Sequence, residues 1–248
     1  MAVNFLQEFI SGHVVLYRAI GAQISYPQTW VGWINVSTGV AWSGASRQAV
    51  TLRGGDGLFV KIGNGSGSTY TIEAGIHDFV FETEAVSSPV SKGDWVHFAV
   101  VWRATGTAIA PGDWDLYING VLADQVVGSS LNPTQVVPNF IIGGYNATEP
   151  DRAIDQTCLA DVARYSSEVP DSEILELANG AHPNEIASAS SLIDDARLVD
   201  FATMTVNEAG TGDYTYLPQP PTGQIVTCVD APPFPEPPEP TPAELGGI

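Results

Sequence analysis

Short apolar runs separated by glycine-rich turns dominate the hydrophobic pattern as far as Tyr165. The run 58–62 shows the pattern clearly, because apolar and polar positions alternate and a glycine-rich turn follows at 63–67. A period of two over about five residues is typical of β-strands. The same features predict strands at 13–17, 30–36, 49–53, 58–62, 70–74, 78–82, 95–102, 115–123, 140–145 and 159–165. Short strands at this spacing favour an all-β sandwich or barrel.

Two of these segments carry more specific information. Residues 95–102 are almost continuously apolar, which predicts a central strand covered on both faces. Residues 115–123 predict a hairpin, because Asn119-Gly120 supplies the positive φ angles that a type I′ turn needs. In that hairpin Leu116 and Ile118 should face one way, with Asp115, Tyr117 and Asn119 facing the other.

The periodicity changes after the strands. Residues 171–180 predict one short helix that starts after Pro170 and ends at Gly180, with an apolar stripe of Ile174, Leu175 and Ala178. A last strand is expected at 196–201.

The chain becomes Pro-rich from Pro218 onward. Such a segment favours extended polyproline II, as a spacer or as an arm on a neighbouring molecule. We therefore divide the chain into a sandwich over 1–217 and an extended arm over 218–248.

The net charge of −19 narrows the range of partners. A nucleic-acid-binding protein needs a basic surface to neutralise phosphates, and an anionic membrane would repel an acidic one. The sequence therefore predicts no nucleic-acid partner and no membrane insertion. We also find no run of about 20 apolar residues and no signal-peptide pattern at the N-terminus.

The two cysteines, Cys158 and Cys228, are too few for a disulfide framework. We expect two buried free thiols, with a single bridge as the alternative. Neither cysteine lies near a histidine in the sequence, so a metal site there is not expected.

The order of four sequence blocks resembles laminin-G-like modules of the concanavalin-A-like superfamily. These blocks are Trp95 to Val100, Trp114 to Ala123, Phe140 to Gly144, and Ala153 to Gly180. The resemblance covers residues 25–185 and implies a jelly-roll sandwich of two antiparallel sheets, one of them concave. Residues 154–162 depart from the usual closing motif by an insertion or a shifted register.

Some proteins of this fold are glycoside hydrolases, with two glutamates and an aspartate on one strand. The nearest pattern here is Glu82-Thr83-Glu84, which lacks the aspartate. We therefore predict no catalytic residues and no enzymatic activity. His97 lies in the strongest strand and is interpreted as a structural residue, because no nucleophile and acid accompany it in the sequence.

Calcium is the candidate metal that the resemblance implies, and no other cofactor is expected. Calcium binds carboxylate and carbonyl oxygens in loops. The candidate ligands are Asp56, Asn146, Asp151 and Asp155, none of which forms a compact acidic run.

Carbohydrate binding needs aromatic platforms beside polar groups. Trp42 and Trp114 lie beside predicted turns and are the best candidates for exposed platforms. Tyr117 and Tyr145 complete the candidate set.

Two functional hypotheses follow. In the first, the protein is a decoration or accessory protein on a virus particle such as a phage head, made in the host cytoplasm and bound to capsid or other particle-surface protein. In the second, it is a carbohydrate-binding lectin module for adhesion to glycans or host surfaces, which would place it outside cells. A homo-oligomer is compatible with both.

Overall fold

The computed structural model describes residues 3–5, 15–19, 26–38, 47–53, 57–63, 67–78, 81–104, 111–129, 139–143, 157–198, 208–209, 213 and 215–217. All structural statements below concern these residues. The arm expected at 218–248 lies outside them.

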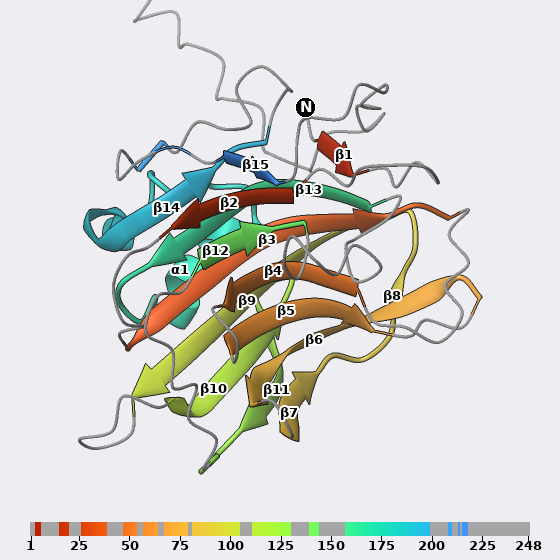
Figure 1. Ribbon diagram of the computed structural model, residues 1–248, viewed down its shortest axis with the longest axis horizontal. Helices are drawn as coiled ribbons and strands as arrows, with labels where there is room; N and C mark the ends of the chain where they lie inside the picture. Colours follow the sequence, from red (N-terminus) through yellow and green to blue (C-terminus); the bar gives the residue numbers. More distant parts are fainter. Residues whose placement is uncertain are drawn as a thin grey trace, which may run out of the picture.

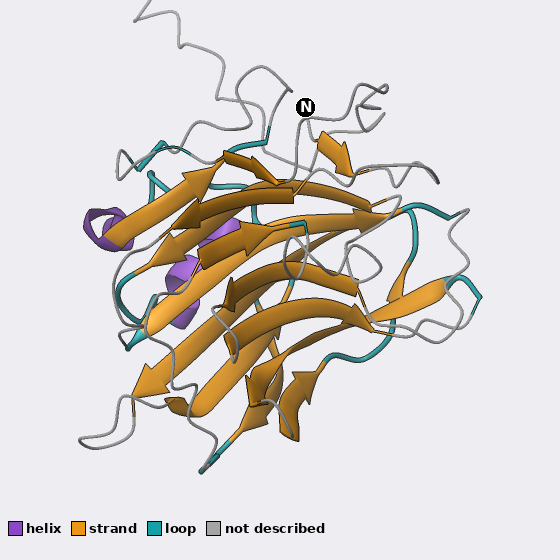
Figure 2. Cartoon of the chain, viewed as in Figure 1, coloured by secondary structure: helices purple, strands orange, loops and turns teal. Residues whose placement is uncertain are grey.

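Strands make up most of the described residues (Figures 1 and 2). In chain order they are β1 (Val3–Phe5), β2 (Val15–Ala19), β3 (Gln28–Val36), β4 (Arg47–Arg53), β5 (Gly57–Gly63), β6 (Thr69–Asp78), β7 (Phe81–Val86), β8 (Val90–Ser91), β9 (Trp95–Ala104), β10 (Pro111–Ile118), β11 (Val121–Val126), β12 (Asn139–Ile142), β13 (Thr157–Tyr165), β14 (Leu192–Ala196) and β15 (Thr215–Leu217). Helix α1 (Asp171–Ala178) and the 3-10 helix η2 (Ala187–Ser191) lie between β13 and β14.

The strands form two sheets, and neighbouring strands pair antiparallel. Sheet A has the order β1-β13-β3-β9-β10-β11, and β14 also pairs with β13. Sheet B has the order β15-β2-β12-β4-β5-β6-β7, and β8 also pairs with β6. The two sheets stack face to face as a sandwich, with sheet B in front in Figure 1. This confirms the all-β jelly-roll prediction.

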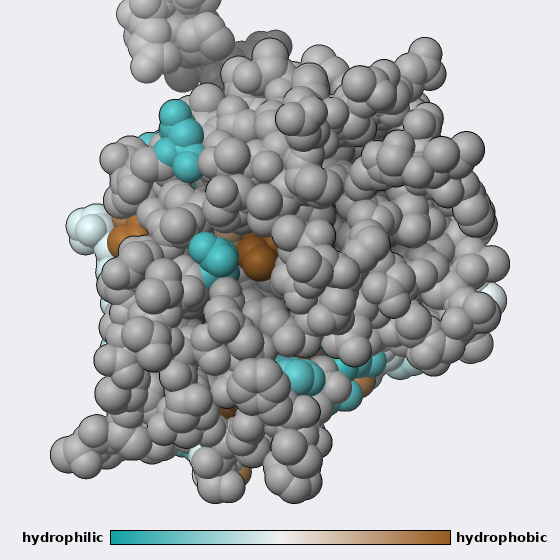
Figure 3. Space-filling model, in the orientation of Figure 1, coloured by the Kyte–Doolittle hydropathy of each residue, from teal (hydrophilic) through white to brown (hydrophobic). Residues whose placement is uncertain are grey.

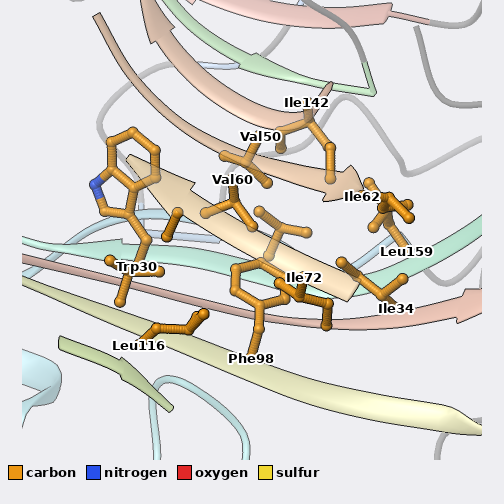
Figure 4. Close-up of a cluster of buried hydrophobic side chains, with 14 of the residues drawn as sticks. Trp30, Ile34, Val50, Val60, Ile62, Ile72, Phe98, Leu116, Ile142 and Leu159 are labelled. Atoms are coloured by element: carbon orange, nitrogen blue, oxygen red, sulfur yellow. The ribbon is translucent and has the colours of Figure 1, made fainter. Parts of the chain in front are cut away.

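The main core fills the space between the sheets (Figure 4). Alternation along each strand directs one set of apolar side chains inward. Trp30, Phe98 and Leu116 come from sheet A, while Val60 and Ile72 come from sheet B. Burial of this apolar surface is the main force that holds the sheets together.

A second core lies on the outer face of sheet A, where α1 packs. Val31, Ala99 and Val101 of the sheet meet Ile174 and Leu177 of the helix. Strand β9 therefore has apolar cover on both faces, as its continuous apolar run predicts. In Figure 2 the helix is seen behind the strands, on the side of sheet A.

The hairpin prediction is confirmed, because β10 and β11 join through Asn119 and Gly120 with φ values of 50° and 78°. Gly120 is also required by packing. A Cβ at this position would lie 2.8 Å from Leu175 Cδ1 and 3.1 Å from Leu175 Cα.

Three local predictions need correction. In α1 the buried residues are Ile174 and Leu177, whereas Leu175 is exposed. The strand expected at 196–201 begins earlier, because β14 runs from Leu192 to Ala196, and residues 199–201 lie outside the described part of the chain. The strand expected at 78–82 is divided between β6, which ends at Asp78, and β7, which starts at Phe81.

On the face seen in Figure 3, the described residues reach the surface in small, separate patches that are mostly hydrophilic. The helices in the described part of the chain are too short and too polar to cross a membrane.

Candidate functional site

The structure contradicts two of the four aromatic candidates for carbohydrate binding. Trp114 is fully buried between the sheets, where its Nε1 donates to the Ala74 carbonyl at 2.9 Å. Tyr117 is buried under α1 and donates its hydroxyl to Asp171 Oδ1 at 2.8 Å. Both are structural residues rather than exposed platforms. Trp42 and Tyr145 lie outside the described residues.

The candidate calcium ligands Asp56, Asn146, Asp151 and Asp155 also lie outside the described residues. Within the described part of the chain, no group of three or more acidic, histidine or cysteine side chains is placed to hold a metal ion.

The prediction of free thiols is wrong for Cys158, which is disulfide-bonded. Its side chain is buried on the outer face of sheet A beside Trp33 and Ala160. The other cysteine of the chain, Cys228, lies outside the described residues.

His97 lies next to this buried group, with its ring 5.2 Å from that of Trp33. Its backbone N–H donates to Asn119 Oδ1 at 2.9 Å and so ties β9 to the hairpin turn. Complete burial lowers the pKa of His97 from 6.5 to about 3. The imidazole is therefore neutral at physiological pH, in keeping with a structural role.

The depressed pKa of His97 makes stability dependent on pH. The unfolded chain binds a proton at this residue below pH 6.5, whereas the folded chain does not until about pH 3. Stability from this residue is therefore lost as pH falls through that window. Between pH 7 and pH 5 we expect His97→Phe to lose about 2 kcal/mol less unfolding free energy than the wild type. Urea unfolding at both pH values measures this difference, and parallel losses in the two proteins would contradict it.

A charged cluster lies on the opposite side of the sandwich, on the outer face of sheet B. We call Lys61, Glu73 and Glu84 the Lys61 cluster. Lys61 Nζ lies 2.5 Å from Glu84 Oε2 and 3.4 Å from Glu73 Oε2. Thr71 Oγ1 donates to Glu73 Oε1 at 2.9 Å, and the Lys61 ammonium lies 4.8 Å from the centre of the Phe59 ring. One cation therefore holds two carboxylates.

Strand register brings these residues together. Lys61 of β5 pairs with Glu73 of β6, and Glu84 of β7 pairs with Gly75 of β6. Their sequence neighbours Ile62, Ile72, Ala74 and Ala85 belong to the core between the sheets. The alternating pleat therefore directs all three charged side chains to the outer face.

Two glycines keep space for the cluster. A Cβ on Gly63 would overlap the Glu73 carboxylate, at 1.7 Å from Oε1. A Cβ on Gly75 would lie 2.8 Å from the Phe59 ring and 2.3 Å from the Thr83 carbonyl. The carboxylate and the ring therefore occupy positions where any other residue would place its own side chain.

The members of the cluster differ in exposure. The side chains of Lys61, Glu73 and Glu84 are 6%, 13% and 31% exposed, respectively. Lys61 is thus the least exposed side chain and Glu84 the most exposed, although the Glu84 Oε2 atom is itself buried. This arrangement can present fixed hydrogen-bond acceptors to a ligand. Sequence reasoning considered Glu84 only as part of a catalytic pair and did not identify Lys61. The one available signal was a lysine inside an otherwise apolar strand.

A second polar network lies where β13, β14 and the segment after α1 meet. Asp161 sits at a bulge of β13 with φ of 45°, and its Oδ2 lies 2.8 Å from His182 Nδ1. That hydrogen bond raises the pKa of His182. Burial raises the pKa of neighbouring Asp195 to about 6. We interpret the network as a structural tie between the strands and the segment after α1.

Comparison with known families places the fold in a described family. Residues 12–175 match the family model described as the concanavalin A-like lectin/glucanases superfamily. No curated protein matches the chain.

Solved structures of similar fold have low sequence identity. A heptameric SAP-like pentraxin from Limulus polyphemus is 13% identical, with a TM-score of 0.54, over 77% of this chain and 90% of that chain. A Bacteroides ovatus protein, named as a candidate carbohydrate-binding protein, is 17% identical, with a TM-score of 0.57, over 93% of this chain and 60% of that chain. The binding domain of botulinum neurotoxin serotype D is 17% identical, with a TM-score of 0.51, over 68% of this chain and 41% of that chain. This chain therefore spans less than two thirds of the last two, and these likenesses show the fold alone.

Proposed function

The chain belongs to the concanavalin A-like lectin/glucanase superfamily, and from this premise we propose that it binds carbohydrate, without cleaving it, at the Lys61 cluster. The lectin-like fold supports binding in general. The Bacteroides protein and the toxin binding domain are named for carbohydrate binding and for binding, respectively, which agrees with this proposal.

The observation that carries the proposal is the fixed orientation of Glu73 and Glu84 by one buried ammonium. Sugar hydroxyls donate hydrogen bonds, and bonds to charged acceptors are stronger than neutral ones. Carboxylates that are already held in place lose little conformational entropy when a ligand binds. No helix of the described residues covers this face, because α1 packs on sheet A.

The ion pairs favour binding over cleavage. A glycoside hydrolase needs one carboxyl group that carries a proton as general acid. An ion pair requires an ionised carboxylate, and Lys61 forms ion pairs with both Glu73 and Glu84. We therefore propose binding rather than cleavage at this cluster.

Glu84→Gln tests the site directly. The substitution keeps the size of the side chain but replaces a charged acceptor with a neutral one. We expect about a tenfold loss of glycan affinity, which is the difference between a charge-assisted and an ordinary hydrogen bond. Isothermal titration with the best ligand from a glycan array measures it. Glu176→Gln, on the exposed side of α1, is the matched control. Equal affinities in the two variants would contradict the placement of the site.

The disulfide bond of Cys158 supports a location outside cells, because disulfides persist mainly in oxidising environments. We therefore propose an extracellular setting for the lectin. We also propose that several copies assemble, as they do in the heptameric pentraxin. Several weak sites in one assembly bind a multivalent surface more tightly than a single site does.

The virus-particle hypothesis remains a second proposal and is compatible with the first. Its support is the strongly acidic composition and the Pro-rich segment, both of which suit attachment to a larger surface. Recovery of the native protein on a particle in many copies is the result that would favour it.

A further inference from the structure

We propose that the segment 179–186, which follows α1, is a pH-sensitive strap that His182 holds on sheet A at mildly acidic pH and releases as the pH rises above neutral. This inference is independent of the proposed carbohydrate binding. It concerns the polar network that joins His182 and Asp161 on the side of sheet A where α1 packs.

Polar and apolar contacts hold the strap against β13. His182 Nδ1 lies 2.8 Å from Asp161 Oδ2, and the Tyr165 hydroxyl donates to the Pro183 carbonyl at 2.8 Å. Ile186 is buried in the second core. Burial raises the pKa of Tyr165 far above its usual range, so that contact does not change charge near neutral pH. The contact between His182 and Asp161 does, because an imidazole titrates in this range.

Asp161 occupies a strained and buried position. Its φ is 45°, and Leu198 has a φ of 54° directly after Arg197, whose carbonyl accepts from the Asp161 N–H at 3.2 Å. Residues other than glycine rarely adopt this left-handed conformation, and they keep it where the surrounding structure fixes them. Asp161 is 3% exposed, and its Oδ1 accepts no hydrogen bond from the described residues. Its carboxylate therefore depends on the hydrogen bond from His182.

The charges around this hydrogen bond balance only when His182 carries a proton. Asp195 is fully buried and lies near enough to Asp161 for the two carboxylates to repel each other. Arg197 Nε lies 3.6 Å from Asp195 Oδ2 and supplies one fixed positive charge. A protonated His182 supplies the second. The charged and titratable groups that face His182 or Asp195 are Asp161, Arg197, Glu185 and Glu208, with Tyr165 also near Asp195.

The direction of the pH effect follows from these groups. The hydrogen bond with Asp161 raises the pKa of His182 above 6.5. The stabilisation of the strap by this contact is therefore complete below pH 6.5 and is lost as the pH rises through the raised pKa. Burial raises the pKa of Asp195 from 3.8 to about 6, so its contribution falls with rising pH as well. Above that pH its buried negative charge is present when His182 becomes neutral.

Hydrogen exchange of the segment 179–186 measures opening of the strap, after correction for the chemical exchange rate at each pH. From about pH 5.5 to about pH 8 we expect protection in the wild type to fall about fivefold, because a charge-assisted hydrogen bond becomes a neutral one at a side chain that is 29% exposed. His182→Gln keeps a donor but cannot titrate, so its protection should be equal at both pH values. His77→Gln, on β6 of the other sheet, is the matched control and should keep the wild-type fall.

Equal protection of the strap at both pH values in the wild type would overturn the inference, as would a fall that persists in His182→Gln. Because a substitution can disturb folding, NMR titration of the His182 imidazole in the wild type provides a second measurement. Its midpoint should lie above 6.5 and coincide with the midpoint at which protection of the strap is lost. A midpoint at or below 6.5 would also overturn the inference.

Discussion

Asp194→Ala is expected to lower the free energy of unfolding by about 3–5 kcal/mol. Asp194 is fully buried and accepts from both Nε and Nη2 of Arg164 at 2.6 Å. Removing the carboxylate leaves a buried guanidinium without its counter-charge, and this uncompensated charge is the source of the cost.

Two uncharged side chains also contact the Arg164 guanidinium. The guanidinium lies 5.2 Å from the ring of Phe140 in the opposite sheet, so it reaches into the sandwich interior. Gln28 Oε1 lies 3.5 Å from Arg164 Nη1 and also accepts from Trp30 Nε1 at 3.1 Å. A neutral oxygen that is already shared cannot balance the full charge.

Chemical denaturation of the purified variants measures this loss. Asp194→Asn keeps the shape and one acceptor, so its loss should be smaller than that of Asp194→Ala. Glu176→Gln, an exposed change, should stay within about 0.5 kcal/mol of wild type. A loss below about 1 kcal/mol in Asp194→Ala would show that water or a rearranged partner compensates Arg164.

The fold could be predicted from the sequence because its signals are local. The continuous apolar run of β9 predicted its cover on both faces, which core residues on either side provide. All of β5 is buried, including Lys61, which the alternation of its sequence did not predict. Alternation along β10 places Trp114 on the face of Leu116, inside the sandwich. The expectation that Trp114 is exposed relied on its position near a turn. It overlooked that residues 114 and 116 of one strand point to the same face.

Helix α1 shows why local patterns have limits. Its sequence allows more than one apolar stripe, and packing on β9 selects Ile174 with Leu177. Leu175 instead contacts the hairpin turn at Gly120 and stays exposed. Only the packing of α1 against β9 decides which of the two possible apolar stripes is buried.

The Lys61 cluster could not be predicted for a related reason. Glu84 and Lys61 lie on strands that are not neighbours, and they meet across β6. Their contact depends on two registers at once, from β5 to β6 and from β6 to β7. Sequence alternation predicts which face a residue occupies but not which residue lies opposite it.

Loss of the disulfide bond of Cys158 is the other large effect that we expect. The chain has two cysteines, so a bond within one molecule joins Cys158 to Cys228, 70 positions apart by the subtraction 228 − 158. Closing a loop of that length restricts the unfolded chain by about 4 kcal/mol. Cys158→Ala should therefore lower the free energy of unfolding by about that amount and the melting temperature by about 10 °C.

Cys228→Ala provides the matched test, because it breaks the same bond from the other end. The two single variants should lose similar stability, and reductant should destabilise the wild type but neither variant. Peptide mapping under non-reducing conditions identifies the bonded pair. Two reactive thiols per unfolded chain, titrated without reductant, would contradict the bond and restore the interpretation of free cysteines. The Cys158 side chain packs beside Trp33 on the face of the sheet that also holds His97. Reduction would then alter the surroundings of both rings, and tryptophan fluorescence provides an independent measure of that change.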